Sequence, residues 1–101
     1  MSESIRHAAQ VAAAEILARR CEALFESAGT DEGAAGHPFR AHDLVGGGLE
    51  HQEARLLALL GAAKAAGGTR LVWKEPLRVR DDAVLARFCV LDKDGADVTP
   101  Q

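Results

Sequence analysis

Residues 70–80 read RLVWKEPLRVR, and this segment decides the fold that the chain is predicted to adopt. Its side chains alternate with a period of two: most odd positions are apolar, and every basic residue falls on an even position. The apolar set is Leu71, Trp73, Leu77 and Val79, and the basic set is Arg70, Lys74, Arg78 and Arg80. Because successive side chains of a strand point to opposite faces, the pattern predicts a strand that buries the only Trp and exposes a row of cations.

A second strand is expected to follow and to complete a β-hairpin over residues 70–91. Asp81 and Asp82 supply the turn between the two strands. Residues 84–91, VLARFCVL, are apolar on both faces apart from Arg87. That composition is typical of a strand whose two faces are both covered by other parts of the protein.

Two details refine the hairpin and the tail that follows it. Pro76 cannot donate a ladder hydrogen bond, so the first strand is expected to lie at a sheet edge or to bulge at that residue. Residues 92–95 have the composition of a further turn, and residues 96–99 are expected to form a short third strand. Both belong to a C-terminal tail over residues 92–101.

Two helices are predicted upstream of the hairpin. The first spans residues 4–28, where apolar side chains recur at three- and four-residue steps, and Gly29 is suited to end it. At about 1.5 Å per residue it is roughly 37 Å long, which exceeds what a domain of this size needs to cover its own core. The second helix spans residues 49–66, with acidic residues in its first turn and Gly67 and Gly68 after its end.

The segment between the helices is predicted to be a flexible connector. Residues 30–48 mix Gly, Pro and charged side chains without a helical or strand period, and they are expected to hold at most a short helical turn. Together the elements predict an α+β fold in which two helices, the N-terminal one long, pack on a small antiparallel sheet built around a C-terminal β-hairpin. A length of 101 residues predicts a single domain over residues 1–101.

Composition and charge narrow the classes of protein to which this chain can belong. A net charge of -3 argues against a protein that binds the phosphates of a nucleic acid over its whole surface. No apolar run approaches the roughly 20 residues of a membrane span, and charged residues interrupt the N-terminal region, so a cytoplasmic protein is expected. Cys21 and Cys89 stand alone in different contexts, which predicts buried thiols in a reducing compartment rather than a disulfide.

Residues with catalytic or metal-binding chemistry form no recognised motif in the sequence. His37, His42 and His51 lack the spacing of a zinc site, and no CxxC pair accompanies them. The triple glycine at residues 46–48 precedes a helix but lacks the Lys and Ser or Thr of a phosphate-binding loop. Cys89 has no His near it in the sequence to activate its thiol. We therefore expect no enzymatic activity, no metal and no cofactor.

The N-terminal helix is predicted to carry a surface for self-association. Its first half is rich in Ala, whose small side chain lets another helix approach closely. The residues expected at the interface are Ile5, Ala9, Ala12 and Ile16. The chain is therefore predicted to form a homodimer.

The basic face of the hairpin is the best candidate for a surface that binds a partner. Its residues are Arg70, Lys74, Arg78 and Arg80 on the first strand and Arg87 on the second. The primary prediction is a small protein-interaction or regulatory domain, without enzymatic activity, that docks an acidic protein partner through these cations. A second interpretation is that the cations only protect an exposed strand from aggregation.

A nucleic-acid-binding regulator is the alternative prediction. The order of helix, connector, residues 41–60 (AHDLVGGGLEHQEARLLALL) and basic hairpin is similar to a winged helix–turn–helix. The resemblance covers about half of the chain and implies a recognition helix in the major groove with a wing on the DNA backbone. Glu50 and Glu53 oppose this alternative, because they would place negative charge against phosphates. Docking to a protein is therefore the favoured prediction.

Overall fold

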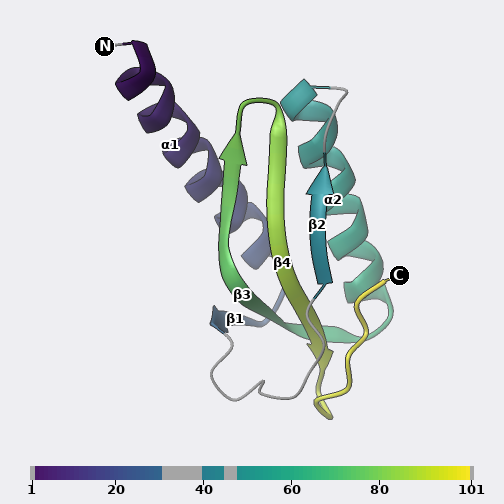
Figure 1. Cartoon of the computed structure of the whole chain (residues 1–101). Coiled ribbons are helices and arrows are strands. Elements are labelled where there is room, and N and C mark those ends of the chain that lie inside the picture. The colour runs from purple at the N-terminus through teal and green to yellow at the C-terminus, as the bar shows by residue number, and fades with distance from the viewer. Residues whose placement is uncertain (1, 31–39, 45–47, 101) are drawn as a thin grey trace.

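The described residues form two helices and a four-stranded mixed sheet (Figure 1). This is a computed structural model, and it describes residues 2–30, 40–44 and 48–100. The elements are α1 (Ser2–Glu22), β1 (Ser27–Thr30), β2 (Arg40–Leu44), α2 (Gly48–Ala65), β3 (Gly68–Arg80) and β4 (Ala83–Asp92). The strands lie in the order β1-β3-β4-β2, with β1 parallel to β3 and the other pairs antiparallel. The predicted α+β class, with two helices on a sheet built around a C-terminal hairpin, is confirmed.

The β3–β4 hairpin, which the alternation of residues 70–80 predicts, occupies the centre of the sheet. Its strands are joined at Asp81 and Asp82, as expected. Asp81 has a positive φ of 55°, a left-handed conformation that Asp tolerates better than most side chains do. The short turn therefore follows from residues that suit it, and it sets the two long strands side by side.

β3 bulges around its proline. The pairing register with β4 shifts between Trp73 and Glu75 and again between Glu75 and Arg78. Pro76 lies within the second shift, where a residue without an N–H costs the ladder least. Both shifts add a residue to β3 relative to β4, and because the two together restore the alternation, apolar residues after the bulge, such as Leu77, lie on the same face as those before it. The alternation read from the sequence therefore survives an irregularity in the middle of the strand.

The first helix is shorter than predicted, ending at Glu22 rather than at residue 28. The chain turns over Leu24 and Phe25, and Phe25 is buried in the core. Ser27–Thr30 then pairs with β3 as a parallel strand, which makes the sheet mixed. Apolar spacing alone could not distinguish a helix that continues to residue 28 from a helix followed by a buried turn and a strand, because a buried turn can repeat the spacing of a helix. Pairing with β3 also overrides the local conformational preference of residues 27–30.

The predicted connector is not without structure throughout. Thr30 belongs to β1, and Arg40–Leu44 forms β2, which pairs antiparallel with residues 84–88. The backbone N–H and C=O groups at the edge of β4 need hydrogen-bond partners. An extended segment supplies them through its own backbone, so β2 can form without the alternating side-chain pattern that predicts a strand. The rest of the predicted connector, residues 31–39 and 45–47, lies outside the described residues.

The hydrophobic core lies between the sheet and the two helices, which both cover the same face (Figure 1). The helices contribute Ala14, Leu17, Cys21, Leu56, Leu60 and Ala63, and the hairpin contributes Leu71, Trp73, Leu77, Val79, Val84, Ala86, Phe88 and Val90. The odd-numbered apolar residues of β3 are therefore buried, as predicted. A smaller buried cluster of Val72, Cys89 and Leu91 lies on the other face of the hairpin.

Polar contacts hold α2 in place against its neighbours. The helix lies close to its predicted range, residues 49–66. Gln52 is fully buried, and its side-chain oxygen accepts a hydrogen bond from the Val84 N–H at 3.0 Å, which ties the first turns of α2 to the start of β4. Arg20 of α1 lies 3.5 Å from Glu53 and joins the two helices. These contacts fix α2 over the β4 side of the sheet.

The C-terminal tail runs back along β4, where a short strand was expected. Asp92 closes the turn, its side-chain oxygen accepting hydrogen bonds from the N–H groups of Asp94 and Ala96, each at 2.9 Å. The Thr99 hydroxyl then accepts a hydrogen bond from the Val90 N–H at 2.8 Å. The pairing amounts to an isolated bridge rather than a full strand.

Gly68, at the passage from α2 into β3, has no room for a side chain. A Cβ there would lie 2.5 Å from Val90 Cγ1 and 2.8 Å from the Ala63 carbonyl oxygen. We therefore expect Gly68→Ala to lower the free energy of unfolding by about 1–3 kcal/mol. Gly61→Ala is the matched control: its Cβ would meet nothing within 4 Å, and alanine in a helix interior is expected to raise that free energy by about 0.5–1 kcal/mol.

Urea denaturation followed by Trp73 fluorescence measures both effects. A Gly68→Ala protein as stable as the parent chain would contradict the close approach of α2 to β3 at this point.

Candidate functional site

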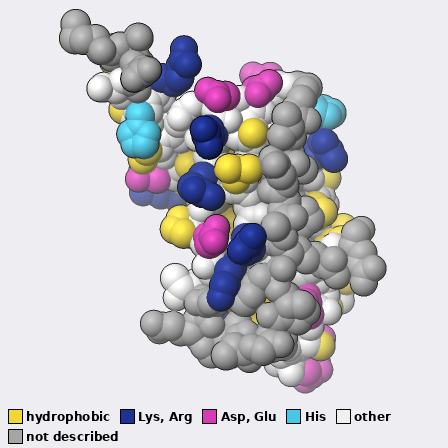
Figure 2. All heavy atoms as spheres, viewed as in Figure 1, with side chains coloured by type: hydrophobic (Ala, Val, Ile, Leu, Met, Phe, Trp, Pro, Cys, Tyr) yellow, Lys and Arg dark blue, Asp and Glu magenta, His cyan; other side chains and the backbone are white. Residues whose placement is uncertain are grey.

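The predicted cations lie on the face of the sheet that the helices leave uncovered. Lys74, Arg78, Arg80 and Arg87 are exposed, and Arg70 is half-buried. Because their apolar neighbours in the strands face the helices, these side chains take the opposite side of the hairpin. Figure 2 shows this side, with Lys and Arg side chains gathered over the hairpin among acidic and apolar ones. We call these five residues the cation face.

One acidic residue, Glu75, divides the cation face. Its carboxylate lies 3.6 Å from Nη1 of Arg87 and 3.9 Å from Nη2 of Arg78. Exposed ion pairs of this kind contribute at most about 1 kcal/mol each, but they cancel part of the positive potential. The alternating pattern predicts that odd-numbered residues face the core, so it does not predict that Glu75 lies among the exposed cations. The register shifts on either side of Glu75 turn it outward.

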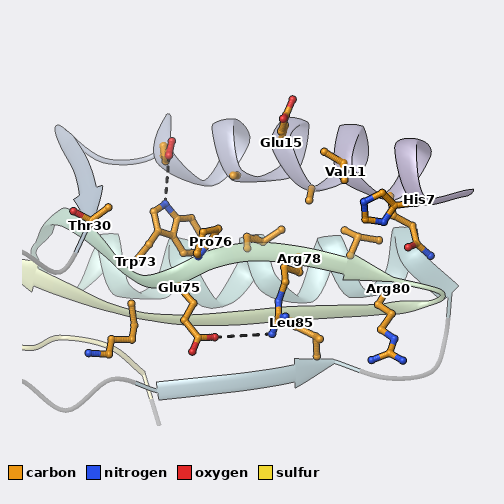
Figure 3. Close-up of a pocket in the computed structure, with 17 residues that line it drawn as sticks. His7, Val11, Glu15, Thr30, Trp73, Glu75, Pro76, Arg78, Arg80 and Leu85 are labelled. Atoms are coloured by element: carbon orange, nitrogen blue, oxygen red, sulfur yellow. Dashed lines mark hydrogen bonds and ion pairs between the residues drawn. The ribbon is translucent and has the colours of Figure 1, made fainter. Parts of the chain in front are cut away.

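A groove of about 700 Å³ runs between α1 and the second half of β3 (Figure 3). Its α1 wall consists of His7, Gln10, Val11, Ala14, Glu15, Ala18 and Glu22, and β3 contributes every residue from 73 to 80. Trp73 stands at one end beside Thr30, and its Nε1 donates a hydrogen bond to Oε1 of Glu22 at 3.3 Å. The sequence does not predict this groove, because it depends on how α1 crosses the sheet.

The groove follows the edge of β3 rather than one of its faces. Consecutive side chains of a strand point to opposite sides, so a hollow lined by all of residues 73–80 must lie alongside the strand. β1 occupies this edge only as far as residues 70–73. Beyond Pro76, no described strand pairs with this edge of β3. We call the unpaired edge of residues 77–80 the open edge.

The residues predicted at a dimer interface form an exposed stripe on α1. Ile5, Ala9, Ala12 and Ile16 are all exposed, and Ile5 and Ile16 are 72% and 59% accessible. Among the α1 residues whose burial is described, Ala14 is the first buried one, so the preceding turns project away from the core (Figure 1). A helical segment with few core contacts is marginally stable in water, which makes α1 a second candidate surface.

The two cysteines are not placed to act as nucleophiles or metal ligands. Both are free and buried. Burial raises the pKa of the Cys21 thiol to about 12 and that of Cys89 to about 11, so both are protonated at neutral pH. Within the ranges that the structure describes, no three His, Cys, Asp or Glu side chains gather as a metal site would require. His37 lies outside those ranges.

Comparison with known proteins does not assign the chain to a family. It matches no protein-family model, no curated protein and no solved structure. In the part of the chain that the structure describes, neither helix combines the length and the apolar character needed to cross a membrane. A function therefore has to be inferred from the cation face, the groove and the stripe on α1.

The buried thiols predict how stability depends on pH. The folded chain keeps both thiol protons above the ordinary thiol pKa of 9.0, whereas the unfolded chain loses them. The contribution is therefore fully present below pH 9.0 and is lost as pH rises from there toward the raised values in the folded chain. We expect the free energy of unfolding to fall by up to about 1.4 kcal/mol per pH unit for each thiol.

Urea unfolding at a series of alkaline pH values measures this slope. Cys21→Ala/Cys89→Ala removes both thiols and is expected to show a shallower decline, whatever its stability at neutral pH. Equal slopes for the two proteins would mean that the thiols do not contribute.

Proposed function

We propose that this chain is a non-enzymatic protein-interaction domain that forms a homodimer through α1 and docks an acidic protein partner through the cation face. The observation that carries the proposal is the placement of the cations. Four of the five are exposed on the one face of the sheet that the helices do not cover. Lys74, Arg78 and Arg80 also border the groove beside β3, so a partner that meets them can enter it. A small regulator of another protein would act in this way.

The charges around the cation face favour a protein partner over a nucleic acid. Glu75 lies among the cations, and the exposed residues Asp81 and Asp82 close the hairpin at its tip. A nucleic acid presents phosphates at regular intervals and would meet these acids as well as the cations. A protein surface can place its own acids opposite the cations alone.

The winged helix–turn–helix alternative has less support. In that motif a short turn joins two helices, whereas β1 and β2 separate α1 from α2 in this chain. Glu50 is exposed in the first turn of α2, and Glu53 lies close behind it. A helix that starts with two acids is poorly suited to a DNA groove.

The stripe on α1 supports a dimer because it is complementary to itself. The steps from Ile5 through Ala9 and Ala12 to Ile16 are four, three and four residues, the spacing of a coiled-coil seam. If two copies of α1 pack antiparallel about a two-fold axis, Ile5 of one copy lies opposite Ile16 of the other and Ala9 opposite Ala12. Each isoleucine that becomes fully buried contributes about 1.5–3 kcal/mol.

Dimerisation through the stripe leaves the groove accessible. Val11 and Ala18 of α1 line the groove, and with 3.6 residues per helical turn they lie on the side of the helix away from Ile5 and Ile16. The same chain can therefore bind its copy and a partner at once. A dimer would present two cation faces, which increases the effective affinity for a partner that carries two acidic segments.

The proposal also places the domain in the cytoplasm. Cys21 and Cys89 are free thiols and are both buried. Unpaired buried cysteines are typical of a reducing compartment.

Charge reversal on the cation face tests the docking surface. We expect Arg78→Glu/Arg80→Glu to weaken binding of a labelled polyglutamate peptide at low salt by about tenfold or more, because attraction becomes repulsion. Both residues are exposed, so the change in stability should stay within about 0.5 kcal/mol. Arg55→Glu/Lys93→Glu makes the same change in net charge elsewhere and should bind almost as the parent does.

Fluorescence anisotropy measures these affinities. Equal binding by the two double variants would show that net charge, and not the cation face, attracts the peptide. A DNA duplex that bound more tightly than the peptide, with a steep dependence on salt, would favour the nucleic-acid alternative instead.

Two substitutions on the stripe test the dimer. We expect sedimentation equilibrium of the parent chain at micromolar concentration to give twice the chain mass of 10.7 kDa. Ile5→Lys/Ile16→Lys puts charge at both ends of the stripe and should give a monomer. Val11→Lys adds a cation to the same helix on its groove side, where the residue is 44% accessible, and should remain dimeric. A parent chain that sediments as a monomer would refute the dimer.

A further inference from the structure

The open edge of β3 is a position where another strand can join the sheet. Over residues 77–80, one edge of the strand faces the groove with no described strand paired to it. An edge of this kind is a template for strand addition, in which main-chain hydrogen bonds supply affinity. The sheet already accepts a short neighbour on this side, since β1 pairs with β3 over only four residues. The open edge has the same length.

The two sides of the groove differ in chemistry. On the helix side of the sheet, Val11 of α1 lines the groove together with the apolar residues Leu77 and Val79 of β3, which belong to the core. On the side that the helices do not cover, Arg78 and Arg80 point away from α1 (Figure 3). A strand that enters the groove would direct alternate side chains to these two environments. Its inner side chains would then be apolar, and its outer ones acidic, because opposite charges in cross-strand pairs are stabilising.

We propose that the groove binds an extended segment of the acidic partner, with alternating apolar and acidic residues, which pairs with residues 77–80 as an added strand of the sheet. This inference rests on the proposed function and specifies how the partner is held. The acidic side chains of the segment meet Arg78 and Arg80. Its apolar side chains lie against Val11, Leu77 and Val79. The result is a five-stranded sheet whose added strand lies beside α1.

A second copy of the chain is a poorer occupant of this edge. Pairing the open edge with its own copy would bring Arg78 and Arg80 close to the same residues of the other copy, and like charges across a strand pair are destabilising. The self-complementary surface of the chain is the stripe on α1, on the other side of that helix. The open edge therefore selects a different, acidic chain.

Pro76 limits where the added strand can pair. It has no N–H to donate, and the register of β3 shifts around it. Regular pairing is therefore expected only after the proline, over residues 77–80. This restriction sets the length of the paired segment at about four residues, comparable with the short strands found in proteins.

A synthetic seven-residue peptide of alternating glutamate and valine, with blocked ends, is the probe for this inference. Trp73 is the only Trp of the chain and lines the groove, so its fluorescence reports occupancy. Amide hydrogen exchange then locates the contact: we expect amides within residues 77–80 to become protected on binding. A peptide with lysine in place of glutamate should not bind.

Two controls separate strand addition from attraction between charges. The same peptide with N-methyl groups on alternate amides keeps its charge but loses main-chain donors on one edge, and it should bind about tenfold more weakly or worse. Val11→Lys should weaken binding by obstructing the apolar side of the groove. Ile5→Lys/Ile16→Lys, on the opposite side of the helix, should leave binding of the peptide unchanged.

The outcomes distinguish this inference from the function on which it rests. Equal affinity for the plain and N-methylated peptides would overturn strand addition and leave charge-driven docking intact. Protection of residues 77–80 that persists in Arg78→Glu/Arg80→Glu with undiminished affinity would support strand addition and overturn docking through the cations. Absence of binding by the plain peptide at millimolar concentration would overturn both, and Pro76 and the cations would then only protect the edge.

Discussion

The structure depends on covering the apolar side of the β3–β4 hairpin. Trp73 and Phe88 lie opposite each other there, their rings in an edge-to-face arrangement with centroids 6.0 Å apart. An isolated hairpin is at best marginally stable in water, so this surface requires a second layer. Leu17 from α1 and Leu56 and Leu60 from α2 supply it. Each such side chain stabilises the fold by about 1.5–3 kcal/mol when fully buried, which accounts for both helices lying on one side of the sheet.

The stripe on α1 and the open edge of β3 both arise because an element is longer than the part of the structure that covers it. α1 has 21 residues, but Ala14 is the first buried one among those whose burial is described. The outer side of the helix carries the apolar stripe. β3 has 13 residues, whereas β1 pairs with four of them, which leaves the open edge. The groove is the space between these two overhanging parts (Figure 3). A longer β1 would fill it, so the short parallel strand is as important for the proposed binding mode as the cations are.

The positive charge of the hairpin does not form a continuous row, because acidic residues lie among the cations. Glu75 lies between Arg78 and Arg87 and pairs with both, at 3.9 and 3.6 Å. Arg80, toward the tip of the hairpin, has exposed acidic neighbours in Asp81 and Asp82. Mixed charges at this spacing give specificity for a matching pattern of acids rather than attraction to any polyanion. The irregular stretch of β3 therefore affects both the shape of the sheet and what it can bind.

The sequence by itself determined the hairpin, the two helices, the α+β class and the exposed positions of most of the cations, because these follow from periods of two and 3.6 residues that act locally. It could not determine that Ser27–Thr30 and Arg40–Leu44 are strands, since β3 and β4 supply their hydrogen bonds from far away in the chain. The outward turn of Glu75, the groove and the open edge were likewise decided only by the tertiary structure. The outward turn of Glu75 depends on how β3 pairs with β4, and the groove and the open edge depend on where β1 stops and how α1 crosses the sheet. None of these is encoded in any short stretch of residues.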